Sequence, residues 1–512
     1  MADILTLKLS PKQLSEIPDL EIWVKNKFPK RHARLLKKSL DARGGQSTYQ
    51  LRVELSDTPL EPILSTIAYP KLSANAKQVI IVGFGPAGMF AALQCIELGL
   101  KPIVIEQGQK VKERRRDLAA INKDHKVNPL SNYCFGEGGA GTYSDGKLYT
   151  RSTKRGNVAK IFSVLVQHGA PEHILYEAHP HIGTNKLPAI VENMRETVLK
   201  AGGEIHFNTQ FLSFITKDNK ITGAKTSAGD FKGESLILAT GHSARQIYEY
   251  LDAEKIKIEY KPFAVGFRIE HEQSFVNDRQ YKGSEKEYLP PANYSLVCNI
   301  DETGVFSFCM CPGGIIAPCA TAPNEIVTNG WSPSKRNNRF ANAGIVTQIS
   351  EEELAKLGYS GDLGGLQLQK DIEQKAGKWA EGSQKAPAQL ALDFINGKRS
   401  KHLKDSSYHP GVFSADFNAL FPKEIAKRLK LGLKAFDKKM PGFLKTNPML
   451  IGPETRTSAP VRIPRESNLM HAEITGLFPC GEGAGYAGGI ASAAMDGERC
   501  AKAVAEFLGV DV

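Results

Sequence analysis

Hydrophobic and polar residues alternate in two short stretches near the start of the chain, residues 4–9 and 49–55. Alternation with a period of two predicts strands that are buried on one face. Residues 11–27 have the pattern of one or two short helices, and a basic stretch follows over residues 25–38. We therefore expect residues 1–75 to form a small α+β domain with a solvated basic face.

The pattern changes at residue 78. A short apolar strand over residues 79–82 runs into a glycine-rich turn and then an apolar helix, which is typical of an α/β domain. Residues 205–241 predict several short strands separated by polar turns. Residues 474–512 return to the same α/β character.

The segment between these parts is harder to interpret. It predicts a loop-rich middle at 312–345 and an amphipathic helix at 423–440. One face of that helix carries Ile425, Leu429, Leu433, Phe436 and Met440. The predicted fold class is α/β, with a Rossmann-like FAD-binding domain, an inserted substrate domain and a small α+β N-terminal domain. The predicted domains span residues 1–75, 76–255 (first part of the FAD-binding domain), 256–445 (inserted substrate or cap domain) and 446–512 (second part of the FAD-binding domain).

Composition narrows the class of protein. A chain of 512 residues with 41% hydrophobic and 24% charged residues is typical of a globular protein with two or three domains. No apolar run approaches a membrane span, and the first residues do not resemble a secretory signal. The eight cysteines show neither a disulfide framework nor a zinc spacing. We expect reduced thiols, no metal and a cytoplasmic location.

The formal net charge of +11 permits attraction to nucleic acid, anionic lipid or an anionic substrate, without choosing among them. An anionic dinucleotide would itself use part of this charge.

The glycine-rich turn carries the most specific chemistry. In Gly83-Phe-Gly85-Pro86-Ala87-Gly88, the first glycine makes the tight turn, the second lets backbone approach a pyrophosphate and the third lets the helix pack on the strand. The helix N-terminus then presents free N–H groups to phosphate. Glu106 ends the next strand, where a carboxylate can accept hydrogen bonds from a ribose diol. The motif in this context predicts a dinucleotide site.

Other segments resemble the two-dinucleotide-binding-fold flavoproteins of the glutathione-reductase superfamily. The resemblance rests on the segments at 209–211, 238–241 and 475–482, and Glu482 stands where that family usually has Asp. It implies FAD as the cofactor, and a helix from Gly489 whose N-terminus faces the flavin.

The sequence is similar over most of its length to a group of FAD-dependent dehydrogenases of unassigned substrate. The motifs lie at residues 38–43, 135–147, 239–245, 308–314, 454–462 and 481–489. With the turn motif, the resemblance implies cofactor contacts from Gly83, Gly85, Pro86, Ala87, Gly88, Glu106, Arg114, Gly138, Gly139, Gly141, Thr142, Lys147, Phe211, Thr240, Gly241, Gly481, Glu482, Gly489 and Ile490.

Candidates for chemistry beyond the flavin are few. Cys309 and Cys311 either exchange electrons with the flavin or are two small hydrophobes on one strand face. His242 is either a proton donor or a turn-capping residue. Arg456 and Arg462 either bind an anionic substrate or hold backbone carbonyls.

The predicted function is hydride transfer between flavin and an unidentified small organic substrate, for which the arginines favour an anion. No second G-x-G-x-x-G follows a strand, so NAD(P)H, if used, would bind transiently in the substrate cleft. The alternatives are a flavin-dependent RNA-modifying or RNA-binding protein, motivated by the basic stretch, and a protein that holds FAD as a structural or sensing element.

Overall fold

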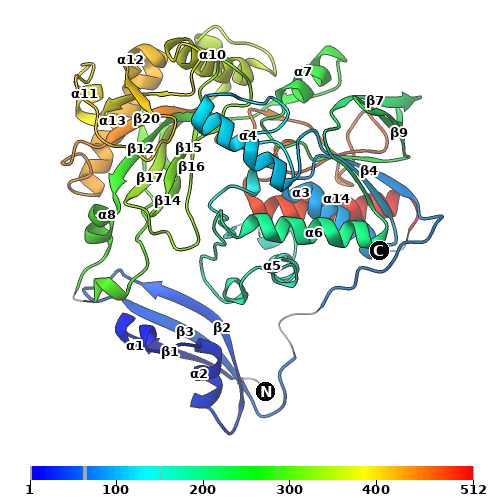
Figure 1. Cartoon of the computed structure of the whole chain (residues 1–512), viewed down its shortest axis with the longest axis horizontal. Coiled ribbons are helices and arrows are strands. Elements are labelled where there is room, and N and C mark those ends of the chain that lie inside the picture. The colour runs from blue at the N-terminus through cyan, green and yellow to red at the C-terminus, as the bar shows by residue number, and fades with distance from the viewer. Residues whose placement is uncertain (1–2, 62–65, 151–152, 284, 511–512) are drawn as a thin grey trace.

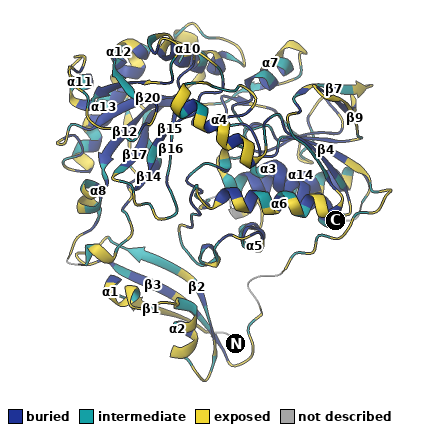
Figure 2. Ribbon diagram, in the orientation of Figure 1, coloured by how far each residue is buried: buried dark blue, intermediate teal, exposed yellow. Residues whose placement is uncertain are grey.

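A computed structural model describes residues 3–61, 66–150, 153–283 and 285–510. Two large β-sheets form its main body, and a small N-terminal sheet lies apart from them (Figure 1). The strands of the large sheets are mostly buried (Figure 2). Short 3₁₀ helices span Gly139–Gly141, Thr153–Arg155, Glu172–Leu175 and Lys286–Tyr288.

The N-terminal unit has the predicted strands and helices. Its sheet has the order β1-β3-β2 and is covered by two short helices. The elements are β1 (Asp3–Leu9), α1 (Pro11–Ser15), α2 (Leu20–Lys27), β2 (His32–Asp41) and β3 (Thr48–Ser56). Alternate residues of β3 (Leu51, Val53 and Leu55) fill the core of this unit.

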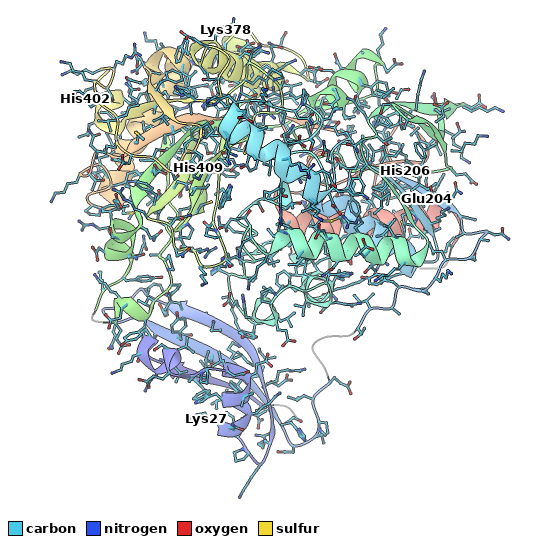
Figure 3. All side chains as sticks on the ribbon, viewed as in Figure 1. Lys27, Glu204, His206, Lys378, His402 and His409 are labelled. Carbon is cyan, nitrogen blue, oxygen red and sulfur yellow. The ribbon has the colours of Figure 1, made fainter. Side chains whose placement is uncertain are left out.

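Only part of the basic stretch is a solvated face, because some of its side chains form ion pairs. Lys25, Lys27 and Lys30 are exposed, and Figure 3 labels Lys27 on this unit. In contrast, Arg34 pairs with Glu54, and Lys38 pairs with Glu177 of the main body at 3.1 Å. Part of the positive charge therefore holds the small unit together and tethers it.

A parallel sheet of order β22-β10-β4-β5-β6 follows, as the α/β pattern predicted. Its strands are β4 (Gln78–Val82), β5 (Lys101–Ile105), β6 (Glu204–His206), β10 (Leu236–Leu238) and β22 (Leu477–Pro479). On the edge strand β6, Glu204 and His206 (labelled in Figure 3) pair through their side chains at 3.0 Å. Charged side chains of this kind protect an open sheet edge from pairing with another chain.

Both faces of the parallel sheet are covered. Val79 and Ile81 of β4 pack with the helices of one face, and Ile80 and Val82 pack with the elements of the other. The first face carries α3 (Pro86–Glu97), α5 (Val158–Gln167), α6 (Leu187–Ala201) and α14 (Ile490–Phe507), with α4 (Val111–Asp124) nearby. The second carries α7 (Arg245–Ala253) and the meander β7 (Phe211–Lys217), β8 (Lys220–Thr226) and β9 (Gly229–Lys232).

The second large sheet is mainly antiparallel, with the order β13-β14-β17-β12-β20-β18-β19. Its strands are β12 (Phe263–Glu272), β13 (Val297–Ile300), β14 (Thr303–Cys311), β17 (Phe340–Ile349), β18 (Ala386–Leu390), β19 (Val412–Ser414) and β20 (Met449–Glu454). The helices around it are α8 (Gln273–Gln280), α9 (Glu351–Lys356), α10 (Gly364–Trp379), α11 (Ala391–Ile395), α12 (Phe417–Leu420) and α13 (Lys423–Lys439). Two small ribbons pair β11 (Glu259–Tyr260) with β21 (Val461–Arg462), and β15 (Ile315–Pro318) with β16 (Thr328–Trp331).

The structure confirms the predicted amphipathic helix as α13, and all five residues of its apolar face are buried. The loop-rich middle at 312–345 was wrong in part, because it contains β15, β16 and the start of β17. Strand β17 is buried on both faces between β12 and β14, so it lacks the alternation that marks a half-buried strand.

The second sheet also continues past residue 445. Strand β20 pairs with β12 and β18 near its centre, although the prediction assigned this segment to the FAD-binding domain. The domain boundaries themselves stay a prediction. The fold is a mixed α/β architecture, with a doubly covered parallel sheet and an additional antiparallel sheet.

None of the described helices combines the length and the apolar character that crossing a membrane would require.

Candidate functional site

A cavity of about 450 Å³ lies between the carboxyl ends of the parallel strands and the second sheet. Ligands of open α/β sheets bind at this end of the strands. One wall comes from the ends of β4, β5 and β10 and from the starts of α3 and α14. The other comes from β14, β15 and β16, including Phe308, Ala317 and Trp331.

The glycine-rich turn after β4 forms part of the first wall. Gly83 has φ +99°, and a Cβ there would lie 2.5 Å from the carbonyl oxygen of Ala239. A Cβ on Gly88 would lie 1.9 Å from the Gly83 carbonyl oxygen, so this residue packs the helix against the turn. At Gly85 the nearest atom to a Cβ is the Gly139 Cα at 3.8 Å, and Gly85, Pro86 and Ala87 line the cavity. The N-terminus of α3 is therefore open to a ligand over Gly85.

Glu106 lines the cavity but has more backbone partners than the ribose prediction required. Its carboxylate accepts hydrogen bonds from the backbone N–H groups of Phe84, Gly108 and Gly136, each at 2.9 Å. This residue thus holds the turn after β4 against the loop at 136. A ribose contact from Glu106 stays a prediction.

The loop at 132–142 is held from beneath by Arg114, which is fully buried. Its guanidinium donates to the backbone carbonyls of Asn132, Tyr133, Glu137 and Gly139 at 2.8 to 2.9 Å.

The same loop separates two groups of predicted residues. Gly139, Gly141 and Lys147 line the cavity. Arg114, Gly138 and Thr142 lie behind it, and the Thr142 hydroxyl donates to the Glu137 carbonyl. The structure gives this second group a role in shaping the loop.

The opposite rim brings together residues that are far apart in sequence. Phe211, Thr240, Gly241, Glu482, Gly489 and Ile490 all line the cavity. His242 also lines it, and its Nδ1 lies 3.4 Å from Oε1 of Glu482. The 18-residue helix α14 begins at Ile490, so a second helix N-terminus opens on the same cavity.

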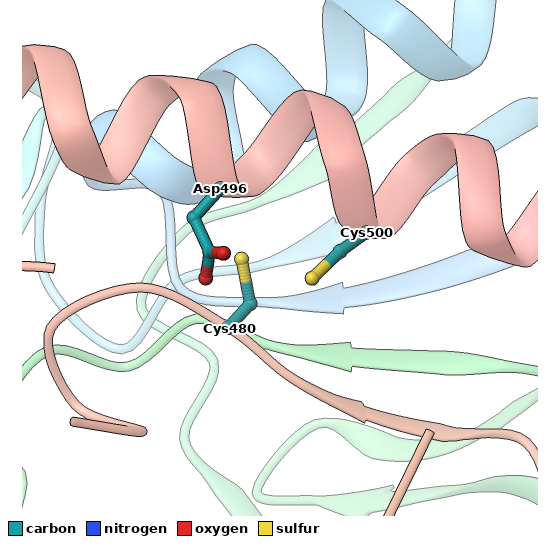
Figure 4. Close-up of side chains that lie close together, drawn as sticks. All are labelled: Cys480, Asp496 and Cys500. Atoms are coloured by element: carbon teal, nitrogen blue, oxygen red, sulfur yellow. The ribbon is translucent and has the colours of Figure 1, made fainter. Parts of the chain in front are cut away.

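Gly481 does not line the cavity, and its backbone is held by Asp496 in the second turn of α14. Its N–H donates to Asp496 at 2.8 Å, and Asp496 forms a two-pronged ion pair with Arg465 at 2.7 and 3.0 Å. Cys480 and Cys500 flank Asp496 (Figure 4). Because Arg465 occupies both carboxylate oxygens, this group fits an ion pair that fixes the turn better than it fits a metal ion.

The predicted substrate arginines do not lie together. Arg462 is exposed and does not line the cavity, whereas Arg456 is buried at its wall. Arg456 pairs with Glu325 at 3.1 Å and with Glu373 at 2.8 Å. Burial opposes ionisation of Glu373, yet Arg245 and Arg456 lower its pKa to about 2. Arg456 thus belongs to a buried ion network, and an anionic substrate gains little from it.

The second wall also contains the candidate thiols. Cys309 lines the cavity and Cys311 is fully buried behind it. Lys147 reaches this wall and pairs with Asp145 at 3.2 Å. Sequence reasoning missed the aromatic lining from Tyr133, Tyr143, Tyr149 and Trp331. The motif at 135–147 contains Tyr143, but no motif marks the other three residues, which meet only through the fold.

Comparisons with known proteins agree with the cofactor that the site suggests. Residues 78–114 match the family model "FAD binding domain", and residues 262–457 match "FAD-dependent protein, C-terminal domain-like". A protein of Clostridium beijerinckii described as an uncharacterized protein is 40% identical over 432 residues, which is 83% of this chain and 80% of that protein.

Similar solved structures include a geranylgeranyl bacteriochlorophyll reductase-like protein from Thermoplasma acidophilum (14% identity, TM-score 0.35, 85% of this chain and 80% of that one). Another is the glycerol-3-phosphate dehydrogenase from Bacillus halodurans complexed with FAD (10% identity, TM-score 0.37, 86% of this chain and 66% of that one). Likeness at these scores says nothing about the substrate of this chain.

The fold and the family matches define an FAD-binding flavoprotein. The chain belongs to the same family as the clostridial protein, a family of FAD-dependent proteins.

Proposed function

We propose that the protein is an FAD-dependent oxidoreductase of the dehydrogenase type, related to the glutathione-reductase superfamily, which transfers a hydride between a small organic substrate and the flavin. The observation that carries this proposal is a cavity onto which two helix N-termini and the open Gly85 backbone face, while a separate sheet closes the opposite side.

The residues present fit FAD. The space above Gly85 and Gly139, which a side chain would fill, suits a pyrophosphate, and the N-terminus of α3 would stabilise its charge. The start of α14 near Gly489 would stabilise negative charge at the other end of the cofactor. When bound, FAD would supply hydride acceptance and donation.

The second wall would then orient the substrate. Phe308 and Trp331 offer apolar surface, and Asn329 offers a polar group. Lys147 supplies a positive charge: burial alone would lower its pKa, but Cys309, Cys311 and Asp145 together raise it above its usual value. This cation favours an organic substrate with a carbonyl or carboxylate group. NAD(P)H would enter the same cleft transiently, if it is the reductant.

The experiment is an anaerobic visible spectrum of the purified protein before and after addition of NADH or NADPH. Bleaching of the oxidised-flavin band within seconds supports an NAD(P)H-coupled oxidoreductase. A band that bleaches only with dithionite supports direct oxidation of an organic substrate. Flavin that resists dithionite as well contradicts the proposal and favours a structural or sensing role.

A further inference from the structure

Two sulfur atoms share one lysine at the second wall of the cavity. Nζ of Lys147 lies 3.8 Å from Sγ of Cys309 and 3.7 Å from Sγ of Cys311. Arg268 approaches from the buried side, with Nη2 3.8 Å from Sγ of Cys311 and 2.9 Å from the Cys309 carbonyl oxygen. The pair of thiols is therefore enclosed by two cations.

A β-bulge creates this arrangement. Strand β14 pairs Phe308 with Gly344 and Cys311 with Asn342, so one extra residue stands on β14. Cys309 takes up the extra length with φ +42°, a left-handed conformation that is uncommon for residues other than glycine. The bulge turns Cys309 to the cavity and leaves Cys311 behind it. Strained backbone of this kind gathers at functional sites.

The charges around Cys309 favour its ionised form. Three cations (Lys147, Arg268 and Arg336) face two carboxyl groups (Asp145 and Glu454). Burial raises the pKa of Glu454 against the pull of Arg268, with which it pairs at 3.0 Å. Burial lowers the pKa of the neighbouring His181 to about 4, which keeps that ring neutral.

The pKa values of the two thiols shift in opposite directions. The hydrogen bond from Cys311, with Lys147 and Arg268, lowers the pKa of Cys309 well below its ordinary value although burial opposes this. The same hydrogen bond and burial raise the pKa of Cys311. The Cys311 thiol donates to the Cys309 carbonyl oxygen at 3.3 Å, and the negative charge is carried by Cys309, whose pKa is the lower of the two.

We propose that Cys309 is a nucleophilic thiolate that forms a covalent bond with a soft carbon electrophile, such as an activated enone, that enters the cavity. Lys147 serves as its counter-ion, and Cys311 stays protonated beside it and donates to the Cys309 carbonyl oxygen. The sulfur lone pair forms the bond to the β-carbon, and the π pair of the double bond moves to the carbonyl oxygen. The resulting enolate takes a proton, for which Lys147 is the adjacent acid; nothing is oxidised or reduced. This reaction does not require the flavin.

The experiment measures the rate of labelling by N-ethylmaleimide, itself an activated enone, by peptide mass spectrometry of the purified full-length protein. Cys298 is the matched control, because it is partly exposed and burial raises its pKa. An ordinary thiol with pKa near 8.5 gains about 100-fold in thiolate, and so in rate, between about pH 6 and pH 8. We expect the rate at Cys309 to change less than about 3-fold over that range, and to exceed the rate at Cys298 by roughly 10-fold at the lower pH.

Two variants test the cause of this reactivity. In Lys147→Met the charge is lost, so labelling of Cys309 should again depend on pH, whereas Lys147→Arg should keep the flat profile. Labelling of Cys309 that rises with pH as steeply as that of Cys298 overturns the proposal. So does an unlabelled Cys309, above all if Cys134, which lines the same cavity, is labelled. Flavin content is read separately from the visible spectrum, so failure here is distinct from failure of the proposed function.

Discussion

Replacement of Gly85 by alanine tests FAD binding without disrupting the fold. The residue has φ −80°, which alanine adopts without strain, and its added Cβ would meet only the Gly139 Cα at 3.8 Å, an ordinary contact. As the first residue before α3, alanine caps the helix less well than glycine and costs up to about 1 kcal/mol. We therefore expect Gly85→Ala to fold.

The same methyl group would occupy the space over the N-terminus of α3 where we place the FAD pyrophosphate. Overfilling a closely packed site by one methyl costs about 1 to 3 kcal/mol, which is a loss of about 5- to 150-fold in affinity. The assay is titration of the flavin-free protein with FAD, followed by flavin fluorescence, beside a thermal unfolding curve of the flavin-free chain.

Gly88→Ala is the matched comparison within the same turn. Its Cβ would lie 1.9 Å from the Gly83 carbonyl oxygen, so the backbone must move and the flavin-free chain should unfold at a clearly lower temperature. The reasoning is refuted if Gly85→Ala binds FAD as tightly as the unaltered protein. It is equally refuted if Gly88→Ala unfolds at the same temperature as Gly85→Ala.

Three other substitutions give independent checks. Arg114→Lys should lose about 2 to 4 kcal/mol of stability in urea unfolding, because one ammonium cannot serve four buried carbonyls. Glu106→Gln should lose about 1 to 3 kcal/mol and part of its FAD occupancy, because one acceptor oxygen is replaced by a donor that faces backbone N–H groups. Burial lowers the pKa of His271 to about 4, so its contribution to stability is complete above about pH 6.5 and is lost as the pH falls toward 4. Between about pH 6.5 and pH 4, the loss of unfolding free energy should be smaller in His271→Gln than in the unaltered protein by up to about 3 kcal/mol. Urea unfolding at both pH values measures this difference.

Each check has an outcome that contradicts it. An Arg114→Lys protein of unchanged stability would mean that the loop at 132–142 does not depend on the guanidinium. Full FAD occupancy in Glu106→Gln would show that FAD binding does not depend on the carboxylate. An acid sensitivity identical in His271→Gln and the unaltered protein would assign the transition to other groups.

Local pattern predicted the elements whose signal is contained in a few neighbouring residues. The strand, turn and helix around Gly83 need only an apolar run and three glycines, and helix α13 needs only its apolar face. Strands such as β17 and β20 were harder, because burial on both faces removes the alternation that identifies a strand. Their place in the second sheet depends on partners distant in sequence, and β20 pairs with β12, which lies more than a hundred residues earlier in the chain.

The residues of the site were likewise predictable only where they lie in local motifs. Gly85, Gly139, Gly241 and Glu482 carry recognisable motifs, and the structure brings them to one cavity. The four carbonyls that occupy Arg114 could not be inferred, because they come from a loop that folds back on its helix. The cations around Cys309 likewise come from separate segments of the chain.

We propose that the cavity over Gly85 holds one FAD per chain. The most direct measurement is the flavin content of the purified protein: the visible absorption of the native chain, release of the flavin by denaturation, and its identification by chromatography and mass. We predict one FAD per chain, present on purification or gained on reconstitution, and a clearly lower content in Gly85→Ala. A folded chain with no flavin after purification and none after incubation with FAD would contradict it.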